Sequence, residues 1–137
     1  MTKLMKSGPG KFVTDFWLLI FRVAVSVAML THGIPKLQML FSGSGITFAD
    51  PLGIGDFWTL ILVVFAEVVC SGLLILGAFS RLTTVPLIVN MAVAFFVVHG
   101  ADPFGKKELA LLYLFIYLTV LVFGGGDYSL DRFFKRR

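Results

Sequence analysis

Three side chains that could do chemistry lie inside long apolar runs of the sequence: Arg22, Glu67 and Asn90. If each run is a membrane-spanning helix, a rise of ~1.5 Å per residue places the three within about two turns of one depth. A charged group at the bilayer centre costs about 2.5–3.5 kcal/mol even on lenient insertion scales. We therefore expect Arg22 to pair with Glu67, with Asn90 hydrogen-bonded to one of them. Such a cluster could relay protons or bind a ligand headgroup, or it could be a structural ion pair that fixes helix register.

Two further polar residues follow Arg22 on the same run. With ~100° between successive helical residues, His32 and Lys36 fall within an arc of roughly 80° with Arg22. A polar stripe on an apolar helix must face protein or water, so we expect this face to point into a helix bundle. Lys36 could instead extend to the membrane interface.

More polar residues lie where the later apolar runs begin and end. His99, Asp102 and Glu108 are there, and with His32 and Lys36 they could line one outward-facing pocket. Cations, a carboxylate and imidazoles could bind the carbonyl oxygens of a quinone. They could also pass protons, because histidine titrates near neutral pH. The alternative is that these residues contact only water and lipid headgroups at the interface.

Two histidines on different helices also raise the question of a bis-histidine haem, but a pattern of two residues gives it little support. His99 follows Asn90 by nine residues, so on an unbroken helix the two would point in opposite directions. No spacing typical of metal ligands occurs in the sequence, and no glycine-rich nucleotide-binding motif does. We therefore expect neither a metal nor a nucleotide.

The elements that must position these residues are apolar runs long enough to be transmembrane helices. We expect helices over approximately residues 16–40, 57–79, 82–100 and 108–126. Pro35 should kink or end the first helix near Gly33, and the very short link at Ser80 and Arg81 makes the second and third helices antiparallel neighbours. The sequence thus predicts an all-α membrane protein, a single domain over residues 1–137 that forms a four-transmembrane-helix antiparallel bundle.

The positive residues predict the orientation of this bundle. Most of them fall on the side that carries both termini: Lys3, Lys6, Lys11, Arg81, Arg132, Lys135, Arg136 and Arg137. The positive-inside rule then places both termini in the cytoplasm. After the last helix, Phe133 and Phe134 stand beside four cations, which is typical of a short interfacial anchor.

Composition excludes several classes of protein. Of the 137 residues, 58% are apolar or aromatic and 15% are charged, and the mean hydropathy of +0.93 is far too high for a disordered chain or a water-soluble globule. The net charge of +4 is concentrated at the termini, which indicates contact with the lipid bilayer rather than with nucleic acid. Cys70 is the single cysteine, so the chain cannot form a disulfide or a thiol pair of its own.

Taken together, the sequence resembles the DoxX family of small four-helix membrane proteins. The resemblance is carried by Leu-Leu-Ile-Phe-Arg22, Thr-His32-Gly33-Ile-Pro35-Lys36, Ala66-Glu67, Ser-Gly72, Ser80-Arg81-Leu, Asn90-Met91, His99-Gly100, Glu108-Leu-Ala-Leu-Leu-Tyr113 and Tyr128-Ser129-Leu130-Asp131. The glycine-rich loop over residues 42–56 is longer than is usual in that family. The resemblance implies four transmembrane helices in the bacterial inner membrane.

The family takes its name from a subunit of a thiosulfate:quinone oxidoreductase, so the resemblance also implies a redox and quinone association. Family-like polar residues, which we expect to form a buried quinone or proton site, are Arg22, His32, Lys36, Glu67, Asn90, His99 and Glu108. The leading hypothesis is a quinone-associated membrane subunit that receives electrons from a partner protein, because the chain carries no visible redox cofactor motif. The alternatives are a non-enzymatic binder of lipids or small molecules, an assembly factor, or a small transporter formed by a homo-oligomer.

Overall fold

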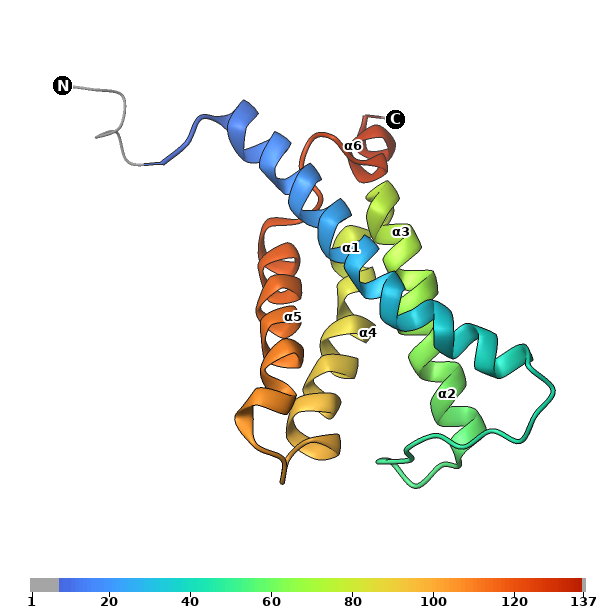
Figure 1. Cartoon of the computed structure of the whole chain (residues 1–137). Helices are drawn as coiled ribbons and strands as arrows, with labels where there is room; N and C mark the ends of the chain where they lie inside the picture. The colour runs from blue at the N-terminus through green and yellow to red at the C-terminus, as the bar shows by residue number, and fades with distance from the viewer. Residues whose placement is uncertain (1–7, 137) are drawn as a thin grey trace.

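The computed structural model describes residues 8–136, and every regular element in that range is helical (Figure 1). In chain order these are α1 Lys11–Phe41, α2 Asp56–Val64, η2 Phe65–Cys70, α3 Ser71–Leu76, α4 Ser80–Val93, η3 Ala94–Val98, α5 Phe104–Phe123 and α6 Leu130–Lys135. The elements η2 and η3 are π-helical turns. Three residues counted for orientation, Lys3, Lys6 and Arg137, lie outside the described residues. The predicted all-α class is confirmed.

Three helical stretches are long and apolar enough to cross a membrane. They are Lys11–Phe41 with 31 residues, Asp56–Leu76 with 21 and Ser80–Val98 with 19. The second and third each run without a break through a π-helical turn. The fourth predicted helix is present as α5, with 20 residues, and it carries the charged residues 106–108 close to its start. Three of the predicted spans are therefore confirmed by length and composition.

The long helices form a bundle that α1 crosses obliquely (Figure 1). α4 and α5 lie side by side and antiparallel, while α2, η2 and α3 form one continuous rod that packs against both α1 and α4. Residues 8–10 and α6 lie at the same end of the bundle, which we call the terminal end. The loops over residues 42–55 and 99–103 lie at the opposite end, which we call the loop end.

Part of the packed core lies towards the terminal end. Leu74, Leu87 and Tyr117 are fully buried, and Met29 of α1 packs with them. Leu74 and Tyr117 lie within about two turns of the terminal ends of α3 and α5. This packing closes the terminal half of the bundle, whereas the loop half contains a large cavity, described below.

The first helix differs from its predicted bounds at both ends. α1 starts at Lys11 instead of residue 16 and continues through Pro35 to Phe41, one residue beyond the predicted bound at residue 40, so the helix does not end near Gly33. Proline removes one backbone donor and usually disturbs a helix. Here α1 packs against α2 and η2, and Gly33 and Lys36 on the two sides of Pro35 both meet Glu67 of η2.

The turn between α3 and α4 confirms that these helices are antiparallel neighbours. Gly77 ends α3 with φ of 72°, a left-handed conformation that glycine adopts without strain. The carboxylate of Asp131 then accepts hydrogen bonds from the backbone N–H groups of Phe79 (2.6 Å) and Ser80 (2.8 Å) at the start of α4. Asp131 thereby fixes α6, the helix that forms at the predicted interfacial anchor, to this turn.

Candidate ligand-binding cavity

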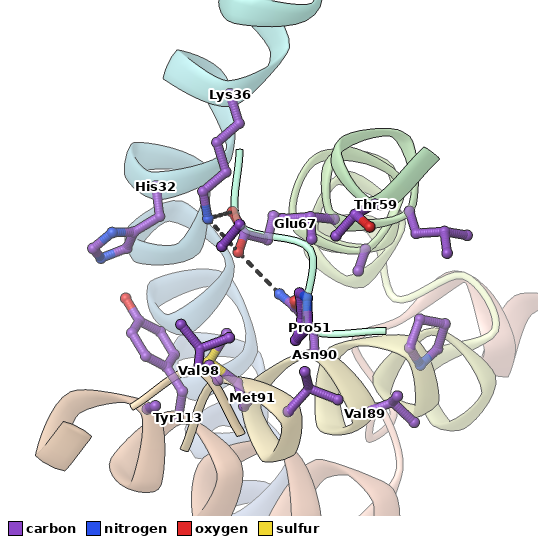
Figure 2. Close-up of a pocket in the computed structure, with 18 of the residues that line it drawn as sticks. His32, Lys36, Pro51, Thr59, Glu67, Val89, Asn90, Met91, Val98 and Tyr113 are labelled. Carbon is purple, nitrogen blue, oxygen red and sulfur yellow. Dashed lines mark hydrogen bonds and ion pairs between the residues drawn. The ribbon is translucent and has the colours of Figure 1, made fainter. Parts of the chain in front are cut away.

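A buried ion pair joins α1 to η2. The Nζ atom of Lys36 donates to both carboxylate oxygens of Glu67, at 2.8 Å to Oε1 and 2.7 Å to Oε2. Asn90 of α4 donates its side-chain amide to Glu67 Oε1 at 2.9 Å, as Figure 2 shows. The Glu67 side chain is 3% exposed and that of Lys36 is 28% exposed. Three hydrogen bonds from two residues, Lys36 on α1 and Asn90 on α4, therefore balance one buried carboxylate.

The local backbone explains why Glu67 can reach these partners. It lies in η2, where the π-helical turn widens the helix at the point that faces α1. Opposite it, α1 has a glycine: a Cβ atom at Gly33 would lie 2.9 Å from Cβ of Glu67 and 2.9 Å from Cγ2 of Val68. The missing side chain at Gly33 thus allows α1 to approach η2 closely enough for the ion pair.

The predicted pair between Arg22 and Glu67 is wrong. The guanidinium of Arg22 is buried, and it donates instead to the backbone carbonyl oxygens of Tyr128 (2.9 Å), Ile75 (3.4 Å) and Gly125. These carbonyls lie at or just beyond the terminal ends of α3 and α5. Unpaired carbonyls and the helix dipole favour a cation there. Arg22 therefore holds the terminal end together and does not take part in the loop-half cluster.

The Lys36–Glu67–Asn90 cluster lies in the wall of a cavity of about 680 Å³. Most of the wall is apolar, and it comes from α1, the α2–η2 rod, the α4–η3 stretch, α5 and the loop over residues 42–55. His32 and Tyr113 also line it, with their rings edge to face at a centroid distance of 6.0 Å. In Figure 2 the Tyr113 hydroxyl points towards His32. Neither side chain makes a hydrogen bond within the described chain.

His99 reaches the same cavity from the end of η3. Asn90 and His99 both line it, although on an unbroken α-helix they would point in opposite directions. The π-helical turn over residues 94–98 lies between them and rotates the end of the helix, which explains the difference. The Nδ1 atom of His99 lies 2.8 Å from a carboxylate oxygen of Asp102. This hydrogen bond, with nearby Lys106, holds the pKa of Asp102 below its ordinary value.

Comparison with known proteins connects this geometry to a family. The family model for DoxX matches residues 17–100, which is more than half of the chain. The chain belongs to the DoxX family. The matched segment includes most of α1, η2 and the α4–η3 stretch, and so it contains every member of the Lys36–Glu67–Asn90 cluster.

One relative of this DoxX-family chain is an uncharacterized protein of Haemophilus influenzae. It is 36% identical over 132 residues, which cover 88% of this chain and 93% of the relative. No solved structure matches the chain.

Within the DoxX-family cavity, five of the seven predicted site residues come together. These are His32, Lys36, Glu67, Asn90 and His99. Arg22 lies at the terminal end. Glu108 is exposed on α5 outside the cavity lining, so the prediction that Glu108 lines the pocket is wrong. In an α-helix Glu108 is two residues from Lys106, and the two therefore face different directions.

The sequence interpretation missed the loop that covers the cavity. Phe48, Pro51 and Leu52 contribute to the lining, and the carboxylate of Asp50 holds the loop in shape. It accepts hydrogen bonds from the N–H groups of Gly55 (2.8 Å) and Ile54 (3.0 Å) and from the hydroxyl of Thr59 (2.9 Å). These bonds, chiefly the one from Gly55, lower the pKa of Asp50. The sequence did contain a signal for this ordered turn, because Asp50 stands directly before a proline and is followed by two glycines.

Proposed function

We propose that this DoxX-family membrane protein binds the ring of a quinone in the cavity, as a membrane subunit of a redox system. One observation carries the proposal: His32 and Tyr113 line an apolar cavity, and their polar atoms have no hydrogen-bond partner in the described chain. A ligand that offers acceptors to these two groups would complete them. A quinone has two such acceptors, its ring carbonyl oxygens.

The residues present fit such a group. Ligand cavities commonly range over about 300–1,000 Å³ and have mostly apolar walls with a few convergent polar groups. The cavity of about 680 Å³ has this character. A bound quinone supplies an electron acceptor whose reduction takes up protons. An imidazole N–H of His32 can donate to a carbonyl oxygen, and Glu67 is a carboxylate held beside the same space by Lys36 and Asn90.

The proposal includes a topology. We propose four spans, with α5 as the fourth, in the bacterial inner membrane and with both termini in the cytoplasm. The uncharged stretch over residues 109–123 would cross the bilayer, and the charged residues 106–108 would lie at the outer interface. Arg81 and the cations of α6 lie at the terminal end, in support of the positive-inside orientation.

Electrons for a bound quinone would come from a partner redox protein, which we propose meets this subunit in the membrane or at its surface. A second copy of the chain is an alternative partner. The partner's presence is testable by purifying the tagged chain from its own membranes in a mild detergent. A co-purifying flavin, haem or iron–sulfur protein would support the redox role, and export components would favour an assembly factor.

A second candidate is a carrier of anionic lipids that does no redox chemistry. Lys106 lines the cavity, and its ammonium group forms no salt bridge in the described chain. A lipid phosphate would fit beside it.

The test is mass spectrometry of an organic extract of the purified protein, compared with Tyr113→Phe. This substitution removes only the hydroxyl, and Tyr128→Phe is the matched control because Tyr128 is 44% exposed and outside the cavity. A stoichiometric quinone in wild type and Tyr128→Phe, reduced about fivefold in Tyr113→Phe, is the expected result for one lost hydrogen bond of ~1 kcal/mol. A phospholipid in its place would favour the lipid carrier, and an empty extract would contradict both.

A further inference from the structure

The cavity opens sideways between two helical stretches. Leu62 and Phe65 of the α2–η2 rod line it and are 52% and 47% exposed, and Val85 and Val89 of α4 line it and are 45% and 56% exposed. A side chain that both lines a cavity and is half exposed lies at the rim of an opening. All four rim residues are apolar. One opening therefore lies between α2–η2 and α4, while Leu52, Val98 and Leu109, which are similarly exposed, border the cavity elsewhere.

This opening faces lipid if the helices span a membrane. The rim residues belong to two of the three stretches that are apolar enough to cross a bilayer, Asp56–Leu76 and Ser80–Val98. Towards the loop end the α2 rod diverges from α4, as Figure 1 shows. An apolar gap between two spans is filled by acyl chains or by another apolar chain, because water would leave its own hydrogen bonds unmade there.

Polar groups are distributed unevenly along the cavity. On α4 and η3 the lining runs from Val85 to His99, about 21 Å at the α-helical rise. His99 and Lys106 lie at the loop end and Asn90 lies in the middle, whereas from Val89 back to Val85 the lining of α4 is apolar. The cavity is thus longer than a single ring, with a polar part and an apolar part that leads to the side opening.

We propose that the ligand carries a long apolar tail, of the polyisoprenoid or alkyl class, which leaves the cavity through this opening into the bilayer. The inference rests on the proposed quinone site and adds a route: the ring enters laterally from the membrane, and the tail remains between α2–η2 and α4. The ring occupies the part of the cavity that contains His32 and Tyr113. The tail passes Phe65 and Val89 at the rim.

The test compares tailed and tail-less quinones on one variant. Val89→Trp fills the opening, and Val97→Trp is the matched control, because Val97 lies on the same helical stretch, is 55% exposed and does not line the cavity. The protein is reconstituted in phosphatidylcholine nanodiscs. Binding of decylubiquinone and of its tail-less ring, dimethoxy-methyl-benzoquinone, is titrated, with phylloquinone and menadione as the corresponding naphthoquinone pair.

For the quinone type that wild type binds, we expect Val89→Trp to weaken the tailed member about tenfold or more and to leave the tail-less member unchanged. Val97→Trp should change neither, and unchanged thermal unfolding of both variants shows that they fold. Equal weakening of both members by Val89→Trp, or weakening of neither, overturns the lateral route while leaving the quinone site in place. A wild type that binds none of the four probes overturns the proposed function and, with it, this inference.

Discussion

At the level of single residues, the central feature of the molecule is a carboxylate buried beside a lysine. Glu67 is charge-balanced by Lys36 and receives a further hydrogen bond from Asn90. Two charges withdrawn from solvent lose hydration, so the pair itself adds little net stability. Removal of one partner is different, because it leaves the other charge buried and alone.

Lys36→Met should therefore destabilise the protein strongly. We expect a loss of about 3–5 kcal/mol in the free energy of unfolding, because Glu67 keeps its burial and loses its counter-charge. The double variant Lys36→Met, Glu67→Gln should recover most of this loss, since a neutral amide replaces the unpaired carboxylate. Denaturant unfolding in detergent micelles measures both. A single variant as stable as wild type, or a double variant no better than the single, contradicts the ion pair.

Sequence reasoning predicted the burial of the charged residues Arg22 and Glu67 but not how they pair, and it also placed the exposed residues His32 and Glu108 in a buried site. The cost of a charge in an apolar run identified Arg22 and Glu67, and both are 2% exposed. Depth along a helix could not assign partners, because a guanidinium side chain is long enough to reach carbonyls at the helix ends. Tyr113 was not among the predicted site residues, because a sequence does not show which face of a tyrosine borders a cavity.

At the scale of elements, the approach of α1 to η2 depends on one glycine. Gly33→Ala would put a methyl group 2.9 Å from Glu67 Cβ and 3.1 Å from its backbone carbonyl carbon, so the two helices must separate. We expect a loss of about 1–3 kcal/mol in stability and weaker ligand binding. Unfolding and quinone titration of the same sample check both effects.

Gly72→Ala is the control for this prediction. It lies in α3, also within a helix, and a Cβ atom there would have no neighbour within 4 Å. Alanine favours a helix over glycine, so this variant should be as stable as wild type or up to ~1 kcal/mol more stable. Similar losses in both variants would show that helix propensity, not close approach, is the cause.

Protonation of Asp50 at low pH should destabilise the loop over the cavity. Its pKa lies below the ordinary value of about 4 because Gly55, Ile54 and Thr59 donate hydrogen bonds to the carboxylate. The stabilisation is therefore complete above about pH 4 and is lost as the pH falls through the lowered pKa. NMR shifts of the Ile54 and Gly55 amides should follow that titration, and Asp50→Asn should abolish it. An unchanged acid titration in Asp50→Asn would assign it to another group.

A pattern of apolar residues predicts where helices lie in the sequence, but it does not predict π-helical turns. The four helices were predicted from composition within a few residues at most ends. The turns η2 and η3 were not, because they differ from α-helix by one hydrogen-bond step and not by hydropathy. Yet η2 carries Glu67, and η3 explains how Asn90 and His99 line the same cavity.

On the scale of the whole molecule, the two ends of the bundle differ in construction. The terminal end is closed by Arg22, Asp131 and a packed core, whereas at the loop end the segment over residues 42–55 covers a cavity. The rigid end holds the helices, and the loop half leaves space between them. This division predicts that ligand-binding variants in the loop half will fold, apart from those that break the ion pair.

The proposed topology predicts opposite labelling of the two ends. In a cysteine-free background made with Cys70→Ala, a cysteine at Ser44 in the loop should react with a membrane-impermeant maleimide added to intact cells. A cysteine at Ser129, at the terminal end, should react only after permeabilisation. Equal labelling of Ser129 in intact cells would contradict cytoplasmic termini.

The most direct test of the central claim is photolabelling with an azido-quinone in nanodiscs. The claim is that the quinone ring occupies the cavity between His32, Tyr113 and Glu67. We expect label on peptides from α1 around His32, from η2 and from the α4–η3 stretch, with competition by decylubiquinone and a loss in Tyr113→Phe. Label confined to the outer surface of α5 or to α6, or label that decylubiquinone does not displace, would contradict it.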